Sequence, residues 1–360
     1  MSLVSPTISA IEPYQAGKPI EEVARELGIL DAVKLASNEN ALGPSPKAVE
    51  AVARSLSELH RYPDAASFVL RNKLAAHVKV DPAEILTGNG SNEILELVVR
   101  TFATSAHHIV FAEPSFVVYR LVALAHGVPF TAVPLSHATH DLRAMATAVT
   151  PNTRVLFVAN PNNPTGTYVT ERDLADFLRA LPEEVIVVVD EAYIEYADAS
   201  DFPDALGMRA LHERLVITRT FSKIYGLAGL RVGYAVAPRN LVDYMNRVRA
   251  PFNVSIPGQV AATAALDDRE HVERTRRTNR EQRDRLTRAL GELGLTVVPS
   301  QANFLCVDMH RPAQPLYEAL LRRGVIVRPI GPLPNALRLT IGLPEENTRL
   351  LLALREVLAT

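Results

Sequence analysis

The segment TRTFSKIYGLAGLRVGY, residues 218–234, contains the residues with the clearest capacity for chemistry. Lys223 lies there beside Ser222 and among small and apolar residues, and Arg231 follows further along. A lysine that is desolvated or lies near another cation has a lowered pKa and can act as a nucleophile or base near neutral pH. Taken alone, the segment is also compatible with an ordinary turn and strand. Whether Lys223 has a chemical role therefore depends on which other residues of the chain lie near it.

Asp190 is the second candidate, because it is a carboxylate at the end of an apolar run. The run EVIVVVD covers residues 184–190, and Tyr193 follows three positions later. Burying an unpaired carboxylate costs several kcal/mol. We therefore expect Asp190 to face a cation or hydrogen-bond donors.

The segment LTGNGSNEILELVV, residues 86–99, places a glycine-rich turn before an amphipathic helix. Backbone amides at the start of such a helix, together with Gly90, Ser91 and Asn92, are suited to binding a phosphate. A dinucleotide fingerprint would need a third glycine where Glu93 stands, which argues against a nicotinamide-dependent dehydrogenase. On its own, the segment is compatible with a phosphate site and with a simply capped helix.

The segment NPNNPTG, residues 160–166, adds a rigid polar turn after another apolar run. These parts together match a cofactor that carries an aldehyde, a phosphate and a ring nitrogen. Lys223 would bond to the aldehyde, and Asp190 would keep the ring nitrogen protonated. The phosphate would be held by Ser91, Asn92, Ser222 and Arg231. This set describes pyridoxal 5′-phosphate.

Five near-continuous apolar runs, each ended by polar or turn residues, recur between helical patterns. Such runs are typical of strands buried on both faces of a mostly parallel sheet, with helices between them. Ligands bind beyond the carboxyl ends of the strands in these sheets, so the polar residues after each run should meet at one site. The runs cover residues 107–114, 154–161, 184–193, 214–220 and 231–238.

We expect an α/β protein with a large domain, a mostly parallel central sheet flanked by helices, and a smaller α/β C-terminal domain. A long charged helix is expected at 267–290, and strand-like runs follow it. Its arginines alternate with Asp and Glu, as on a solvated face. The expected divisions are 1–38 for an N-terminal arm and first helix, 39–255 for the large domain and 256–360 for the small domain.

The composition is that of an ordinary globular protein, with 360 residues, 48% hydrophobic and 22% charged. A formal net charge of −2 provides no field that would attract nucleic acid or a membrane surface. One cysteine excludes an internal disulfide, and we expect no signal segment or membrane-spanning helix. The histidines have no regular pattern of nearby carboxylates, so no metal site is expected. These features favour a cytoplasmic protein that acts on small molecules.

In order and number, the motifs of this chain resemble those of the histidinol-phosphate aminotransferase family, among the fold-type I pyridoxal-phosphate enzymes. The resemblance runs nearly from end to end and implies the fold and the cofactor of that family. The matching segments are PYQAGKPIEEVARELG, KLASNENALGPSP, RYPD, TGNGSNE, EPSFVVY, NPNNPTG, DEAYIEY, TFSKIYGLAGLRVGY and LRLTIG.

The resemblance also implies roles around the cofactor ring. Phe116 would stack on the ring, and Asn163 and Tyr193 would hydrogen-bond its 3-oxygen, while Asp190 would pair with its nitrogen. Tyr62 resembles the family residue that reaches the cofactor phosphate of the neighbouring subunit. That role implies a homodimer.

Arg338 resembles the arginine that receives the substrate carboxylate in aminotransferases. A guanidinium binds a carboxylate or a phosphate through two parallel hydrogen bonds, which a lysine cannot reproduce. Arg328 is a second candidate contact for a substrate anion, and by resemblance alone Asn40 and Tyr14 would complete the substrate pocket.

The activity implied is a ping-pong transamination in which histidinol phosphate gives nitrogen to 2-oxoglutarate and Lys223 moves the proton. An aromatic amino acid aminotransferase, with phenylalanine as substrate, is the alternative, because a site for one ring also accepts another ring of similar size. A phosphothreonine-type decarboxylase and a catalytically silent relative are further alternatives.

Overall fold

The computed structural model describes residues 3–13 and 17–359. Its largest sheet has seven strands: β2 (Ile85–Asn89), β3 (His108–Glu113), β4 (Phe130–Pro134), β5 (Thr153–Ala159), β6 (Ile186–Asp190), β7 (Leu215–Thr220) and β8 (Val232–Val236). They lie in the order β2-β8-β7-β6-β5-β3-β4. All neighbouring pairs are parallel except the two that involve β8. The predicted α/β fold with a mostly parallel central sheet is confirmed.

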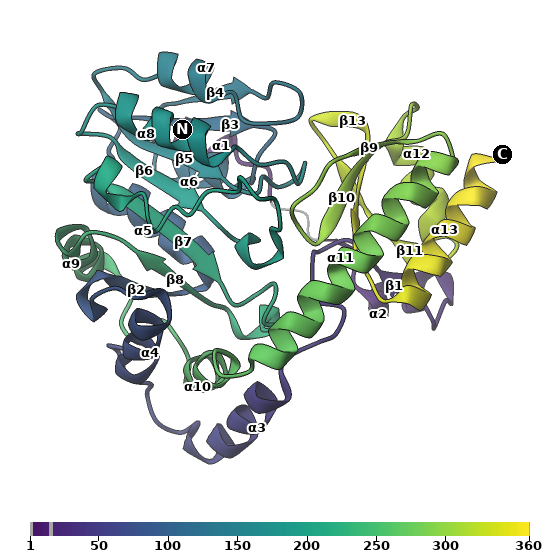
Figure 1. The fold of residues 1–360 in the computed structure, drawn as a ribbon, viewed down its shortest axis with the longest axis horizontal. Helices are drawn as coiled ribbons and strands as arrows, with labels where there is room; N and C mark the ends of the chain where they lie inside the picture. The colour runs from purple at the N-terminus through teal and green to yellow at the C-terminus, as the bar shows by residue number, and fades with distance from the viewer. Residues whose placement is uncertain (1–2, 14–16, 360) are drawn as a thin grey trace.

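Helices cover both faces of this sheet (Figure 1). They are α5 (Gly90–Phe102), α6 (Val118–Ala125), α7 (Leu142–Thr147), α8 (Glu171–Ala180) and α9 (Arg239–Val248). One core cluster joins the sheet to α5, α6 and α9, and another joins it to α7 and α8. The sheet is therefore the middle of three layers.

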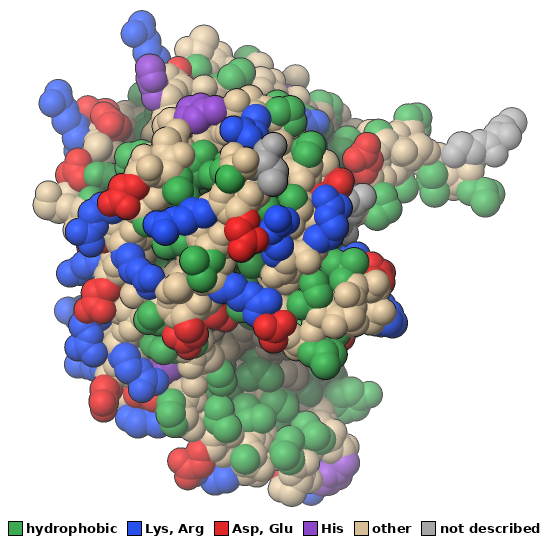
Figure 2. All heavy atoms as spheres, turned by 90° about the vertical axis from the view of Figure 1, so that its right-hand side faces the viewer, with side chains coloured by type: hydrophobic (Ala, Val, Ile, Leu, Met, Phe, Trp, Pro, Cys, Tyr) green, Lys and Arg blue, Asp and Glu red, His purple; other side chains and the backbone are tan. Residues whose placement is uncertain are grey.

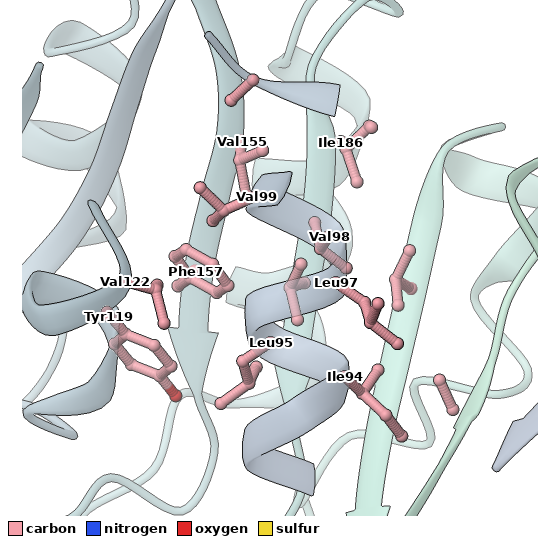
Figure 3. Close-up of a cluster of buried hydrophobic side chains, with 14 of the residues drawn as sticks. Ile94, Leu95, Leu97, Val98, Val99, Tyr119, Val122, Val155, Phe157 and Ile186 are labelled. Carbon is pink, nitrogen blue, oxygen red and sulfur yellow. The ribbon is translucent and has the colours of Figure 1, made fainter. Parts of the chain in front are cut away.

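The strand β5 shows why the buried strands have continuous apolar runs. Val155 and Phe157 belong to the core under α5, and Figure 3 shows them beside Val99 and Leu95 of that helix. The intervening Leu156 belongs to the core on the opposite face. Because successive side chains of a strand point to opposite faces, every position must be apolar when helices cover both.

The strand β8 is antiparallel because the link that precedes it is short. Only residues 221–231 join β7 to β8, and a parallel pair needs a crossover of a dozen or more residues. The link therefore stays at the edge where β7 ends, and it carries Lys223. The edge strand β4 was not among the five predicted runs, because Val133 is its one buried residue and no continuous apolar run forms.

A smaller unit follows the large sheet and has an antiparallel sheet of its own. Its elements are β9 (Thr296–Val298), β10 (Phe304–Asp308), β12 (Arg328–Ile330), β13 (Leu333–Thr340), α11 (Arg269–Glu292), α12 (Ala313–Leu321) and α13 (Pro344–Leu358). The strand order is β12-β13-β10-β9, and the three helices share one core cluster with the sheet. The short strand β1 (Val33–Lys34) pairs in parallel with β11 (Val325–Ile326), which ties the N-terminal segment to this unit.

Three helices pack together beside β8, away from the small sheet. They are α3 (Pro46–Ser55), α4 (Phe68–Val78) and α10 (Ile256–Ala265). α10 contacts both of the others and shares a core cluster with β2 and β8. It therefore packs with the large unit, although the domain boundaries expected from the sequence stay a prediction.

The remaining elements are short. They are α1 (Pro6–Ser9), α2 (Ile20–Leu27), η1 (Leu56–Glu58), η2 (Pro82–Glu84), η3 (Ile194–Tyr196), η4 (Arg209–Leu211) and η5 (Ala228–Leu230). Cationic and anionic side chains alternate over the face shown in Figure 2, which includes the small unit. Among the residues described, no helix combines the length and the apolar character needed to cross a membrane.

The start of α5 lies against β8 at a glycine. A Cβ added to Gly233 would lie 2.6 Å from the carbonyl carbon of Gly90 and closer still to the backbone nitrogen of Ser91. Both contacts are with backbone atoms, so a side chain at this position must shift the first turn of α5.

Gly233→Ala should therefore lower the free energy of unfolding by about 1–3 kcal/mol, the usual cost of overpacking a dense core. Gly291→Ala in α11 is the matched control, because its added Cβ would meet no described atom within 4 Å apart from the neighbouring residues and backbone of its own helix. The control should gain roughly 0.5–1 kcal/mol, since alanine loses less conformational entropy in a helix. Chemical denaturation measures both, and a Gly233→Ala variant as stable as the control would contradict this packing.

Candidate active site

The polar residues after the central strands meet at one edge of the large sheet. Parallel β5, β6 and β7 end at this edge, and antiparallel β8 begins there. Together with the start of α5 and part of the small unit they enclose a cavity of about 220 Å³. Its polar and aromatic lining consists of Ser37, Asn38, Ser91, Asn92, Phe116, Asn163, Asp190, Tyr193, Thr220, Ser222, Lys223, Arg231 and Arg338.

Asp190 is the last residue of β6 and is only 4% exposed. Its Oδ2 accepts a hydrogen bond from the Tyr119 hydroxyl at 2.9 Å, and its Oδ1 accepts one from Thr218 Oγ1 at 2.9 Å. Burial raises the pKa of Asp190, and these two bonds only partly oppose that effect. Asp190 makes no salt bridge within the described part of the chain. A cationic ligand group beside it would stabilise the carboxylate.

Lys223 lies in the link between β7 and β8, where its Nζ donates a hydrogen bond to the Ser37 carbonyl at 3.2 Å. Enclosure in the protein lowers the pKa of Lys223 to about 7, and repulsion from Arg338 and Arg231 acts in the same direction. A large fraction of this amine is therefore neutral near pH 7. Neutral amines react with aldehydes and accept protons.

The start of α5 and the start of β8 form an anion cradle. Arg231 Nη1 donates to Ser222 Oγ at 3.3 Å, and the Gly90 amide donates to the Arg231 carbonyl at 3.0 Å. A Cβ on Gly90 would lie 2.5 Å from Arg231 Nη2, and Gly90 has a left-handed φ of 73°. Glycine at this position thus lets the guanidinium approach the helix N-terminus, where the amides and the macrodipole favour an anion.

Three side chains expected around a cofactor ring line the same cavity. Phe116 is half-buried, and its ring centroid lies 5.8 Å from that of Tyr119. Asn163 Oδ1 accepts a hydrogen bond from Arg338 Nη1 at 2.7 Å. Tyr193 is 4% exposed, and Lys223 Nζ lies 5.6 Å from the centroid of its ring. The structure brings these side chains together, and their roles toward a ring stay predictions.

Arg338 reaches the cavity from β13 of the small unit. Its Nη2 donates to the Ala36 carbonyl at 2.6 Å, and its guanidinium lies 5.5 Å from the centroid of the Phe304 ring. Arg328 is paired with Arg338 across β12 and β13, but it is not part of the cavity lining. Of the two arginines proposed for substrate, only Arg338 faces the cavity.

Besides Arg328, three further predicted site residues lie elsewhere or outside the described residues. Asn40 donates from Nδ2 to the Ile224 carbonyl at 2.8 Å and lines two neighbouring cavities. Tyr62 is 81% exposed and stacks on Phe252 with ring centroids 4.7 Å apart. Tyr14 lies outside the described residues.

Sequence reasoning missed Ser37, Asn38 and Thr220, which also line the cavity. The segment KLASNEN is among the matching motifs, but the residue expected to reach the substrate was Asn40. Asn38 has a left-handed φ of 53°, and this local turn decides which asparagine faces the cavity. Asparagine adopts this conformation more readily than most residues, but the sequence alone does not reveal the turn.

The cavity fits pyridoxal 5′-phosphate in chemical type. Asp190 offers a buried carboxylate to a ring cation, and Lys223 offers an amine of lowered pKa to an aldehyde. The cradle between α5 and Arg231 offers backbone amides and a guanidinium to a phosphate. Each part of the cofactor therefore has a chemically matched group in this lining.

The comparison with known proteins agrees with this chemistry. Residues 31–354 match the family model described as aminotransferase class I and II. The chain is 49% identical over 363 residues to histidinol-phosphate aminotransferase 2 of Pseudomonas fluorescens, covering 100% of this chain and 98% of that protein. It is 50% identical, with the same coverage, to the protein of that name from Pseudomonas aeruginosa.

Solved structures show the same fold. The crystal structure of histidinol-phosphate aminotransferase from Sinorhizobium meliloti, in complex with pyridoxal-5′-phosphate, has a TM-score of 0.91 and 28% identity. The structural alignment covers 100% of this chain and 98% of the Sinorhizobium meliloti chain. Histidinol-phosphate aminotransferase from Clostridium acetobutylicum has a TM-score of 0.83 at 25% identity, covering 91% of this chain and 99% of its own. This chain therefore belongs to the aminotransferase class I and II family and, within it, to the histidinol-phosphate aminotransferase family.

Proposed function

We propose that this protein is a pyridoxal-phosphate-dependent transaminase that exchanges nitrogen between histidinol phosphate and 2-oxoglutarate. The observation that carries the proposal is the meeting of a low-pKa lysine, a buried carboxylate and an anion cradle in one cavity. Relatives that are 49% and 50% identical over the whole chain bear the name of this activity.

The cofactor would be held by groups already in place. The start of α5, with Gly90, Ser91 and Asn92, would bind the phosphate together with Ser222 and Arg231. Asp190 would pair with the ring nitrogen, Phe116 would stack on the ring, and Asn163 and Tyr193 would bind the ring oxygen. When bound, pyridoxal phosphate supplies an electron sink for the charge that develops at the carbon bearing the substrate's amino group.

Lys223 would anchor the cofactor and then act as the base. Its Nζ would accept the proton from the substrate carbon that bears the amino group and return it later in the cycle. A pKa of about 7 keeps much of the amine neutral near pH 7, as this task requires. General acid–base transfer of this kind contributes on the order of 10²–10⁴ in rate.

Arg338 would bind the anionic end of each substrate. Glutamate and 2-oxoglutarate present a carboxylate, whereas histidinol phosphate presents a phosphate and no carboxylate. A guanidinium accepts either group through two parallel hydrogen bonds. Arg338 already donates to Asn163 and to the Ala36 carbonyl, so the substrate anion joins or replaces these contacts. Arg328, Asn40 and Tyr14 remain proposed substrate contacts by resemblance alone.

We also propose that the protein is a homodimer. Large apolar side chains are exposed on α3 and around the start of α4, and exposed apolar patches commonly mark interfaces. Figure 2 shows hydrophobic side chains gathered toward the bottom of the molecule, where α3 lies in Figure 1. The exposed residues of this surface include Val49, Leu56, Leu59, Tyr62, Phe68, Val69 and Phe252. The cytoplasmic location expected from the sequence stays a prediction.

The lowered pKa of Lys223 predicts the reactivity of the cofactor-free protein. Competitive labelling with acetic anhydride, read by mass spectrometry, reports the neutral fraction of each amine. Labelling of Lys223 should rise about tenfold per pH unit below pH 7 and level off above it, since its pKa is about 7. Arg338→Met should move the rise to higher pH, because it removes a neighbouring cation. Wild-type labelling that continues to rise beyond about pH 9 would contradict the lowered pKa.

A dimer in which Tyr62 reaches the partner's cofactor phosphate predicts a specific binding defect. Tyr62→Phe keeps the ring that stacks on Phe252 but removes the hydroxyl. Equilibrium dialysis should show the cofactor bound about 10- to 100-fold more weakly, the usual value of a hydrogen bond to a charged group. Tyr244→Phe, at another exposed tyrosine, is the control and should bind normally. A monomer in analytical ultracentrifugation, or normal binding by Tyr62→Phe, would refute this role.

A single half-reaction tests the proposed activity. Cofactor-loaded protein is mixed in turn with histidinol phosphate, phenylalanine or glutamate, and the visible cofactor absorbance is followed by stopped flow. We expect histidinol phosphate to react with a kcat/KM well above that of phenylalanine, and Lys223→Ala to retain the fold but lose all turnover.

Other outcomes would point to the alternatives. Preference for phenylalanine would indicate an aromatic amino acid aminotransferase, and release of carbon dioxide from a phosphorylated amino acid would indicate a decarboxylase. If no amino donor changes the absorbance, the proposed activity is wrong.

A further inference from the structure

Asn38, a residue outside the predicted site, holds the hydroxyl of Tyr193 through a hydrogen bond. Asn38 is 1% exposed and lines the cavity. Its Nδ2 donates a hydrogen bond to the Tyr193 hydroxyl at 2.9 Å. The direction of this bond matters. When the Tyr193 hydroxyl oxygen accepts a hydrogen bond from Asn38, its own hydrogen is donated to a different acceptor.

The direction of the bond depends on which end of the Asn38 amide faces Tyr193, and Thr340 settles that orientation. Thr340 Oγ1 accepts a hydrogen bond from the Asn38 backbone N–H at 3.0 Å and lies 3.1 Å from Asn38 Oδ1. Thr340 is 3% exposed, and no other acceptor for its hydroxyl is found in the described ranges. The hydroxyl therefore donates to Oδ1, because the reversed amide would leave its hydrogen buried without an acceptor. Nδ2 is then the end that faces Tyr193.

The backbone of Asn38 is held as firmly as its side chain. Asn303 Nδ2 donates to the Asn38 carbonyl at 3.1 Å. Asn303 and Thr340 both belong to the small unit, and Thr340 follows Arg338 by two residues on β13. Tyr193, in contrast, follows β6 of the large sheet. Asn38 thus joins the strand that carries Arg338 to a side chain that follows β6 of the large sheet.

We propose that Thr340 and Asn38 form a hydrogen-bond relay that makes Tyr193 a donor toward the ring oxygen of the cofactor. The inference rests on the proposed function, because the acceptor belongs to the cofactor. Asn38 and Thr340 are positioning residues, since they act through Tyr193. A donor at the ring oxygen would stabilise negative charge on the bound cofactor and so would lower the pH at which its visible absorbance changes.

The charged groups that line the cavity around Tyr193 are Lys223, Asp190, Arg231 and Arg338. Any new charge at position 38 acts on the cofactor through space as well as through Tyr193. A test must therefore separate the effect of charge from the effect of the relay.

Asn38→Asp is the sharpest variant, because it replaces the donating Nδ2 by an acceptor oxygen of the same size. Tyr193 would then donate to the introduced carboxylate and no longer to the ring oxygen. The readout is the pH midpoint of the visible absorbance change of the cofactor-loaded protein. We expect this midpoint to rise by about one pH unit, which corresponds to the loss of one hydrogen bond to a charged group.

The same substitution in a Tyr193→Phe background isolates the relay. The introduced carboxylate carries its charge in both backgrounds, whereas the relay acts only where the hydroxyl is present. We expect the rise caused by Asn38→Asp to be clearly smaller in the Phe background. Equal rises in the two backgrounds would overturn the relay.

Thr340 provides a second, uncharged test. Thr340→Val removes the hydroxyl that orients the amide and should raise the midpoint, whereas Thr340→Ser keeps the hydroxyl and should leave it unchanged. Equal midpoints for the two variants would also overturn the relay. If the wild-type protein binds pyridoxal phosphate without any visible absorbance band, the proposed function has failed instead, so the two failures are distinguishable.

Discussion

The buried carboxylate of Asp190 determines which ligands this cavity can bind. Asp190 stands at the end of a strand whose residues are all buried, and it receives hydrogen bonds from Tyr119 and Thr218. Two neutral donors do not balance a buried charge, and the pKa of Asp190 is accordingly raised. A ligand that places a cation beside this carboxylate lowers that cost, and a protonated pyridine nitrogen is a cation of suitable size.

The other charges of the cavity are arranged around this requirement. Arg231 and the start of α5 provide positive potential where we propose that a phosphate binds, and Arg338 provides it where we propose that a substrate anion binds. Burial is the main cause of the lowered pKa of Lys223, and repulsion from both arginines acts in the same direction, so the amine is largely neutral near pH 7. The sheet imposes this arrangement, because the ends of β5, β6 and β7 and the start of β8 meet at one edge.

The features of the fold and site that the sequence predicts are those that leave a pattern in neighbouring residues of the chain. Strands buried on both faces leave continuous apolar runs, and the polar residues that end or follow such a run mark the sheet edge. Asp190 ends one run, and Lys223 closely follows the run 214–220. Asn38 was not among the predicted site residues, because a left-handed turn and long-range contacts with Thr340 and Asn303 place it in the cavity lining. The role of Asn40 stays a prediction. The antiparallel direction of β8 was within reach of the sequence, because the predicted runs 214–220 and 231–238 already leave a link too short for a parallel crossover.

The protonation state of the cofactor's ring nitrogen tests the role of Asp190 most directly. Pyridoxal phosphate labelled with ¹⁵N in the ring can be bound to the protein, and its nitrogen chemical shift can be recorded across the pH range in which the free cofactor loses this proton. We predict a protonated nitrogen throughout this range in the wild-type protein and an unprotonated nitrogen in Asp190→Ala at the upper end of it. An unprotonated nitrogen in the wild type, or the same shift in both proteins, would contradict the central place given to Asp190.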